Sequence, residues 1–181
     1  MIYLFLAEGF EEIEALTQAD LLRRAGLDVK CVSVYKNCSM VSGAHNIKVV
    51  PDCTITKTSV SSEDMILLPG GMPGVENLYS CKKLTDLIKS HYDNGGKIAA
   101  ICAAPIILGR LGILDDKMAT CYPGFENELT GAKYFDCPIV VDGNIITAKA
   151  AGVAIELSAE IITLLAGEEK TDNVLSEIYY E

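Results

Sequence analysis

Cys102 is the residue of this sequence whose surroundings most favour covalent chemistry. It follows the apolar run Lys97–Ile101 and precedes the small residues Ala103 and Ala104 and then Pro105. Proline suits the first turn of a helix, where its missing N–H has no consequence. A tight turn of small residues between a strand and a helix is the layout of a nucleophile elbow, and the start of a helix favours a thiolate by lowering the pKa of the thiol. We therefore predict a reactive thiol here, against the alternative of a small buried hydrophobic side chain.

Gly70 and Gly71 are the second candidate, because they follow the buried strand predicted at Asp64–Leu68. Glycine lets the backbone approach a ligand closely, so its N–H groups can stabilise an oxyanion. The alternative is a plain turn after a strand, and the two glycines alone favour that interpretation.

Three acids, Glu11, Glu12 and Glu14, lie in the turn and first helical residues after the first strand. Acids in the first turn of a helix usually face water and complement the helix dipole. One of them could instead point over the strand ends toward Cys102. Their spacing does not choose among the three.

The histidines, His45 and His91, give no sign of a metal site. Neither has a cysteine or carboxylate at metal-ligand spacing, and the sequence contains no C-x-x-C pair. His91 is expected to interact with the C-terminal dipole of its helix. The phosphate-binding motifs G-x-G-x-x-G and G-x-x-x-x-G-K-[ST] are also absent. We expect no metal and no nucleotide cofactor.

Length and charge restrict the class of protein. The chain has 181 residues, 50% of them hydrophobic and 22% charged, which predicts one globular domain over residues 1–181. Its formal net charge of −10 argues against nucleic acids and anionic membranes, because phosphates would be repelled. The longest nearly uncharged apolar stretch, Ile98–Gly109, contains Pro105 and is too short to span a bilayer. Without a basic leader before the first strand, we expect a cytoplasmic protein.

The seven cysteines are an odd number and suit free thiols better than a disulfide framework. Cys31 and Cys53 fall on or near strands and are expected in the core. Cys121 ends a strand and could line the same pocket as Cys102. The remaining three look incidental in polar loops: Cys38, Cys81 and Cys137.

Short apolar runs alternate with amphipathic segments along the chain. Such alternation predicts an α/β fold with a mostly parallel sheet covered by helices on both faces, whose ligand site lies beyond the carboxyl ends of the strands. In the first helix we expect Ile13, Leu16, Ala19 and Leu22 near one face. The predicted strands are Ile2–Ala7, Asp28–Tyr35, Ile47–Val50, Asp64–Leu68, Lys97–Ile101, Met118–Cys121 and a hairpin of Pro138–Val141 with Ile145–Ala148. The predicted helices are Phe10–Ala25, Leu84–His91, Pro105–Leu111, Gly124–Leu129, Val153–Leu165 and Glu168–Tyr180.

Four motifs in unbroken order resemble the ThiJ/PfpI superfamily, in the branch of the parkinsonism-associated deglycase and its bacterial relatives. They read LAEGFEEIE at 6–14, LLRRAG at 21–26, LLPGG at 67–71 and AAICAAP at 99–105. The resemblance runs from about Ile2 to Leu165. It implies a flavodoxin-like three-layer sandwich and a homodimer.

By position, Cys102 matches the reactive, oxidation-prone cysteine of that family, and Glu14 matches the glutamate that hydrogen-bonds it. Gly70, Gly71 and Ala103 match the backbone positions around the oxyanion site. The resemblance thereby selects Glu14 among the three acids as the protonated partner of the thiolate.

Other positions are less closely matched. His45 falls where a basic residue of relatives reaches the pocket of the second subunit; the alternative is a loop histidine in water. Ala103 stands where the protease-like branch has a histidine, so we exclude a protease. Tyr122 occupies the place of a pocket histidine, and Lys149–Val153 replaces Gly-Pro-Gly-Thr. Fewer polar contacts to substrate are expected there.

The resemblance implies glyoxalase or deglycase chemistry on small 2-oxoaldehydes or their adducts, without metal, glutathione or nucleotide. Cys102 would form a hemithioacetal and Glu14 would move protons. The alternative is a redox sensor or oxidative-stress chaperone in which Cys102 is oxidised to a sulfinic acid without turnover. A third possibility is a chain that has kept the fold and lost activity.

Overall fold

The computed structural model describes residues 1–37 and 40–180, so Cys38 lies outside the described residues. The strands are β1 (Ile2–Leu6), β2 (Val29–Ser33), β3 (Val41–Ser42), β4 (Lys48–Val49), β5 (Cys53–Thr54), β6 (Met65–Leu68), β7 (Lys97–Ile101), β8 (Met118–Ala119), β9 (Lys133–Tyr134), β10 (Ile139–Asp142) and β11 (Ile145–Ala148). The α-helices are α1 (Glu12–Arg24), α2 (Gly74–Ser80), α3 (Lys82–Asp93), α4 (Pro105–Arg110), α5 (Ala154–Ala166) and α6 (Glu168–Glu177). Short 3-10 helices span Ile55–Lys57, Glu126–Glu128 and Ala151–Val153.

The central sheet has the strand order β10-β11-β7-β6-β1-β2-β5. Its pairs are parallel except β10 with β11, which form the predicted antiparallel hairpin. In the register of the central strands, Leu68 lies opposite Ala100 and Ala148 opposite Ile101. The carboxyl ends of β6, β7 and β11 therefore meet at one edge, which brings Gly70 and Cys102 together.

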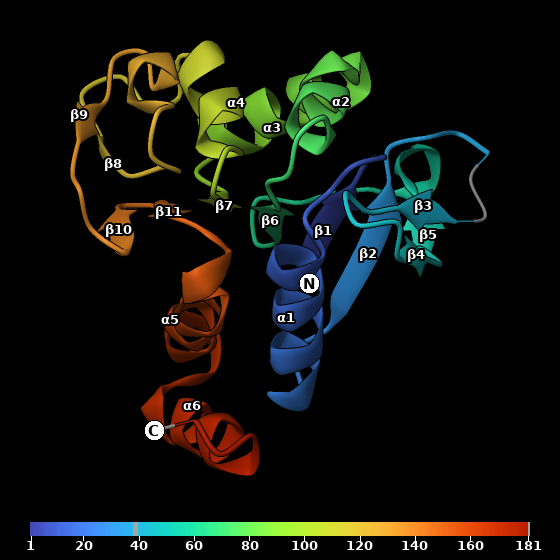
Figure 1. Ribbon diagram of the computed structural model, residues 1–181, viewed down its shortest axis with the longest axis vertical. Helices are drawn as coiled ribbons and strands as arrows, with labels where there is room; N and C mark the ends of the chain where they lie inside the picture. The colour runs from blue at the N-terminus through green and yellow to red at the C-terminus, as the bar shows by residue number, and fades with distance from the viewer. Residues whose placement is uncertain (38–39, 181) are drawn as a thin grey trace.

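Helices cover both faces of the sheet, with α1, α5 and α6 on one side and α2, α3 and α4 on the other (Figure 1). The fully buried strand β1 supplies both layers, because successive side chains of a strand point to opposite faces. Leu4 and Leu6 pack with α1 and α5, whereas Tyr3 and Phe5 pack with α2 and α3. This is the predicted flavodoxin-like sandwich, with its core divided by the sheet.

Several predicted elements differ in extent or place. The expected strand Met118–Cys121 is reduced to β8, which pairs with β9 outside the central sheet. The strand expected at Ile47–Val50 is β4, which pairs with β3 in a separate two-stranded ribbon. The helix expected at Gly124–Leu129 is a single 3-10 turn. These segments are only four to six residues long, so they carry too little periodicity to define an element.

The buried face of α1 also differs from the prediction. Ile13 is 57% exposed, whereas Glu14 and Gln18 are buried together with Leu21 and Leu22. The helix thus presents a buried face that begins with an acid and an amide. Within the described residues, no helix combines the length and the apolar character needed to cross a bilayer.

Candidate active site

Cys102 lies in the turn between β7 and α4 with a backbone φ of +64°. This left-handed conformation costs a non-glycine residue about 1–2 kcal/mol, so the neighbouring contacts must hold it. The Cys102 N–H donates to the carbonyl of Ala148 at 2.9 Å, and the Cys102 carbonyl accepts from the N–H of Tyr122 at 2.8 Å. The predicted elbow is therefore present, and its backbone is fixed on both sides.

Glu14 extends from the first turn of α1 to the same point and is fully buried. Its Oε2 accepts a hydrogen bond of 2.7 Å from the N–H of Gly70. The Glu14 carboxyl and the Cys102 thiol interact and shift each other's pKa, while Glu14 Oε1 is buried without a hydrogen-bond partner among the described residues. Of the three acids that the sequence left open, Glu14 is the one whose carboxyl lies against the sulfur.

Gly70 and Gly71 make this close approach possible. A Cβ on Gly70 would lie 2.6 Å from Glu14 Oε2 and 2.7 Å from the Cβ of Cys102, so a larger residue cannot fit without moving both. Gly71 has a φ of +89°, which few other residues adopt. The N–H groups of Gly71 and Ala103 act to lower the pKa of the Cys102 thiol and so favour its thiolate. The three predicted backbone positions thus surround the thiol and its carboxyl partner.

Burial sets the proton affinities of this pair. It raises the pKa of Glu14 to about 7, and the charge of Glu11 adds to the effect, while hydrogen bonds from Cys102 and Gly70 oppose it. Burial also raises the pKa of the Cys102 thiol, as do the charge and hydrogen bond of Glu14; the N–H groups of Ala103 and Gly71 lower it. The expectation that the thiol pKa is lowered was wrong. The helix α4 has only six residues, and the effect of burial, which raises the pKa, is larger than the effect of the helix N-terminus, which lowers it. Protonation of Glu14 removes the repulsion that disfavours the thiolate.

His45 lies beside two acids of its own chain. Its Nδ1 is 2.8 Å from Glu12 Oε2 and 3.5 Å from Glu11 Oε2. The hydrogen bond with Glu12 raises the pKa of His45. Glu12 is buried, which acts to raise its pKa, yet the hydrogen bonds from His45 and Ile47 bring the pKa below its usual value. Sequence spacing missed this group, because His45 and Glu12 are far apart in the chain and are joined only by the loop packing on α1.

The other predicted pocket residues lie at the edge of the site. Cys121 is fully buried in the core on the α2 to α4 side, so it does not line an open pocket, and burial raises the pKa of its thiol to about 11. Tyr122 is exposed beside the elbow, with its ring 6.3 Å from that of Phe125. Lys149 follows β11 and pairs with Asp136.

The remaining histidine and cysteines have structural surroundings. His91 is buried in the last turn of α3, where its Nε2 lies 3.1 Å from the carbonyl of Lys97. It is a packed core residue rather than only a partner of the helix dipole. Cys31 is buried as expected, Cys53 and Cys81 are half-buried against the core, and Cys137 is exposed.

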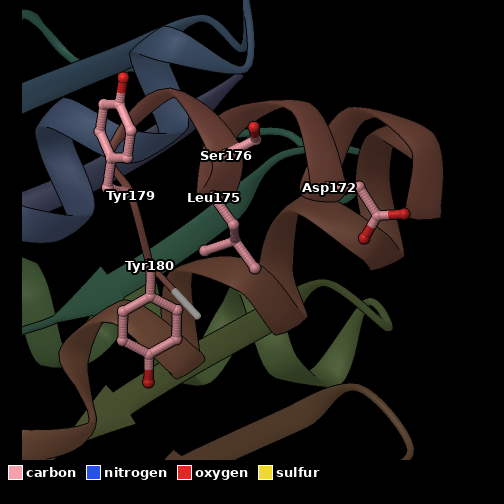
Figure 2. Close-up of a pocket in the computed structure, with 5 residues that line it drawn as sticks. All are labelled: Asp172, Leu175, Ser176, Tyr179 and Tyr180. Carbon is pink, nitrogen blue, oxygen red and sulfur yellow. The ribbon is translucent and has the colours of Figure 1, made fainter.

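A separate hollow of about 380 Å³ lies at α6, where none of its lining residues belongs to the predicted site (Figure 2). Figure 2 shows Tyr179 and Tyr180 pointing in opposite directions. Tyr180 donates a hydrogen bond of 2.7 Å to Glu156 of α5, which ties the end of the chain to the sandwich. This hydrogen bond gives Tyr180 a structural role. The lining side chains are Asp172, Leu175, Ser176, Tyr179 and Tyr180.

Comparison with known proteins points to one family. The model of the DJ-1/PfpI family matches residues 1–164. Protein DJ-1 homolog A of Arabidopsis thaliana is 40% identical over 94% of this chain, which spans only 44% of that relative's length. The glutathione-independent glyoxalase DJR-1.2 of Caenorhabditis elegans is 35% identical over 94% of this chain and 91% of its own. The crystal structure of Drosophila melanogaster DJ-1beta has a TM-score of 0.93, with 33% identity and coverage of 99% of this chain and 97% of its own.

Proposed function

The chain belongs to the DJ-1/PfpI family, and we propose that it is a cofactor-independent glyoxalase or deglycase acting on small 2-oxoaldehydes or their adducts. One observation carries the proposal: the Cys102 thiol is fixed on a strained elbow against the buried carboxyl of Glu14. A similar relative bears the name of a glutathione-independent glyoxalase, which supports this class of substrate.

The first step is addition of Cys102 to the aldehyde. The sulfur forms a bond to the aldehyde carbon, the carbonyl π bond breaks, and the oxygen takes a proton, giving a hemithioacetal. Glu14 accepts the thiol proton as the sulfur attacks. A carboxyl whose pKa is about 7 suits this task, because proton transfer is most efficient when the pKa lies near the working pH. The N–H groups of Gly71 and Ala103 stabilise negative charge on the sulfur or on the developing oxyanion.

The second step moves hydrogen between the two carbons. Glu14, once ionised, removes the proton from the hemithioacetal carbon, and a proton returns to the neighbouring ketone carbon. The former aldehyde carbon is thereby oxidised to a thioester while the ketone is reduced to an alcohol, so no external oxidant is needed. Water then cleaves the thioester to release a 2-hydroxy acid and the free thiol. Each step uses Cys102, Glu14 and water, and the proposal calls for no metal or cofactor.

Conversion of methylglyoxal to lactate tests the proposal. We expect turnover by the wild type, none by Cys102→Ser, and a loss of about 10²–10⁴-fold in Glu14→Gln, which is the usual contribution of a positioned acid or base. Cys137→Ser is the matched control, because this exposed thiol lies outside the site and its loss should leave the rate unchanged. Equal rates in the wild type, Cys102→Ser and Glu14→Gln would refute the proposal.

The alternative function is redox sensing at the same thiol. Attack of the Cys102 thiolate on hydrogen peroxide gives a sulfenate and water, and a second peroxide gives a sulfinate. The carboxyl of Glu14 and the two N–H groups could hold the added oxygens, which is the observation that favours this candidate. Gain of two oxygens at Cys102 under mild peroxide, without methylglyoxal turnover, would select it over the enzyme.

We also propose a cytoplasmic homodimer. None of the six cysteines in the described residues forms a disulfide, which suits a reducing compartment. Ile13, Ile47 and Val50 are 57%, 53% and 71% exposed near the start of α1 and at the two ends of β4, and we propose that a second copy covers this apolar surface. Light scattering should give a dimer for the wild type and a monomer for Ile47→Glu. Leu164→Glu, on exposed surface of α5, is the control.

A further inference from the structure

Glu11, Glu12 and His45 form a compact group outside the pair of Cys102 and Glu14. One carboxylate oxygen from each acid and the Nδ1 of the imidazole all lie within 4.8 Å of one another. The group joins the start of α1 to the loop between β3 and β4. Its donor set, two carboxylates and one imidazole, is of the kind that binds a transition metal.

Each carboxylate has one oxygen held by the backbone and the other turned toward the imidazole. Glu12 Oε1 accepts from the N–H groups of His45 at 2.7 Å and Ile47 at 3.3 Å, while Glu12 Oε2 lies 2.8 Å from Nδ1. Glu11 Oε1 accepts from the N–H of Ile13 at 3.4 Å, while Glu11 Oε2 faces Nδ1 at 3.5 Å. Outer hydrogen bonds of this type orient metal ligands in known sites. The two carboxylates are thus oriented before any ion binds.

Gly43 shows that the loop is built around the Glu12 carboxylate. A Cβ at this position would lie 2.3 Å from Glu12 Oε1, so the chain can close over the acid only with glycine here. Glu12 is 95% buried as a result, whereas the His45 side chain is 68% exposed. A buried carboxylate beside an imidazole that is exposed in the single chain gives an ion a rigid ligand.

The charges of the group are incompletely balanced. Within residues 1–37 and 40–180, no lysine or arginine forms an ion pair with Glu11 or Glu12, whose partner is the imidazole of His45. A divalent cation would neutralise both carboxylates and leave the imidazole neutral, as a metal ligand must be.

The distances fit a small tetrahedral ion. With metal–ligand bonds of about 2.0–2.1 Å, neighbouring ligands of a tetrahedron lie about 3.3–3.4 Å apart. The two donor separations from Nδ1, 2.8 Å and 3.5 Å, lie on either side of that value. Small movements would bring each glutamate oxygen to a tetrahedral distance from Nδ1, and water could supply the fourth ligand. Magnesium and calcium prefer all-oxygen sites, so the imidazole favours zinc or a similar ion.

We propose that Glu11, Glu12 and His45 bind a zinc-class divalent cation at the start of α1. The site uses none of the side chains that carry the thiol chemistry, and the proposal does not rest on the proposed function. It binds one ion per chain through His45 Nδ1 and one oxygen of each glutamate.

The test is a zinc titration of the metal-free protein followed through the imidazole signals in NMR spectra. The sequence has two histidines, so His45→Gln assigns both rings. Zinc should shift the ring signals of His45 and leave those of the buried His91 in place. Isothermal titration with Zn²⁺ should give one site, weakened at least about tenfold in His45→Gln and in Glu12→Gln. The amide oxygen of Glu12→Gln can still accept from the loop, so this variant keeps the fold.

Glu63→Gln, a change of the same charge at an exposed acid, is the matched control and should bind zinc like the wild type. Repeating the titration in Cys102→Ser excludes binding at the reactive thiol. Light scattering accompanies each titration, because Ile13 and Ile47 beside the group also belong to the proposed dimer face. Unmoved His45 signals, or equal affinity in the wild type and both ligand variants, would overturn the proposal.

Discussion

Replacing Glu14 with glutamine should change how the stability of the protein depends on pH. Glutamine has the shape of the protonated acid and keeps an oxygen for the N–H of Gly70, but it does not titrate. In the folded protein the pKa of Glu14 is raised to about 7, from 4.5 in the unfolded chain. Between those two values the folded state holds a proton that the unfolded state has lost.

The sign and size of the effect follow from this difference. Because the folded state binds more protons in this window, the free energy of unfolding of the wild type falls as pH rises from about 4.5 to about 7, and the Glu14 contribution is constant outside it. A change of one pKa unit corresponds to about 1.4 kcal/mol, so the whole window amounts to about 3 kcal/mol. Glu14→Gln removes this loss, and its advantage over the wild type should grow by about 2.5 kcal/mol from pH 5 to pH 8.

Urea denaturation of both proteins at a series of pH values measures this difference. Subtracting the two curves cancels the titration of all other groups, which the variants share. Cys102→Ser serves as a second reference, since it keeps the buried acid and should retain most of the pH dependence. A difference between the wild type and Glu14→Gln that stays constant from pH 5 to pH 8 would refute a buried acid with a raised pKa.

Three further predictions concern backbone positions. Gly70→Ala should lower turnover at least about tenfold while the protein still folds, because its Cβ would lie 2.6 Å from Glu14 Oε2 and displace the acid; the methylglyoxal assay and circular dichroism measure the two properties. Cys102→Gly should be more stable to urea than Cys102→Ala by about 1 kcal/mol, because glycine accepts the φ of +64° without strain, and equal stabilities would contradict a strained elbow. Gly96→Ala should lower the free energy of unfolding by about 1–3 kcal/mol, since its Cβ would lie 2.1 Å from the buried ring of His91, and an unchanged urea midpoint would count against this packing.

The fold was largely predictable because its central strands are short apolar runs buried on both faces. Such runs indicate a parallel sheet whatever their exact ends. The two-residue strands β3, β4, β8 and β9 were not predictable in the same way, since a pair of residues has no period. Their pairing depends on tertiary packing of the surrounding loops.

The site was predictable in part. The small residues after β7, followed by Pro105, are enough to indicate the elbow, because a sharp strand-to-helix turn leaves little room for large side chains. The choice of Glu14 over Glu11 and Glu12 depended on the family resemblance, since three acids within one helical turn look alike in sequence. A direct signal was present in the spacing of Glu14, Gln18 and Leu22, which follow the helical period and share the buried face. Because Ile13 is apolar, we expected it on the buried face of α1, whereas the residue buried there is its neighbour Glu14.

Three features that are unfavourable for stability lie together at the site of Cys102, Glu14 and Gly70. An acid that is buried with no cationic partner among the described residues, a cysteine in the left-handed region and a glycine with no space for a Cβ each lower stability or restrict the sequence. Scattered through the molecule, such features would each need a separate structural explanation. Glu14, Cys102 and Gly70 instead contact one another, and relaxing any of the three would separate the carboxyl from the sulfur. All three unfavourable features maintain the contact between the Glu14 carboxyl and the Cys102 sulfur. Such a coincidence indicates that this contact serves function rather than stability.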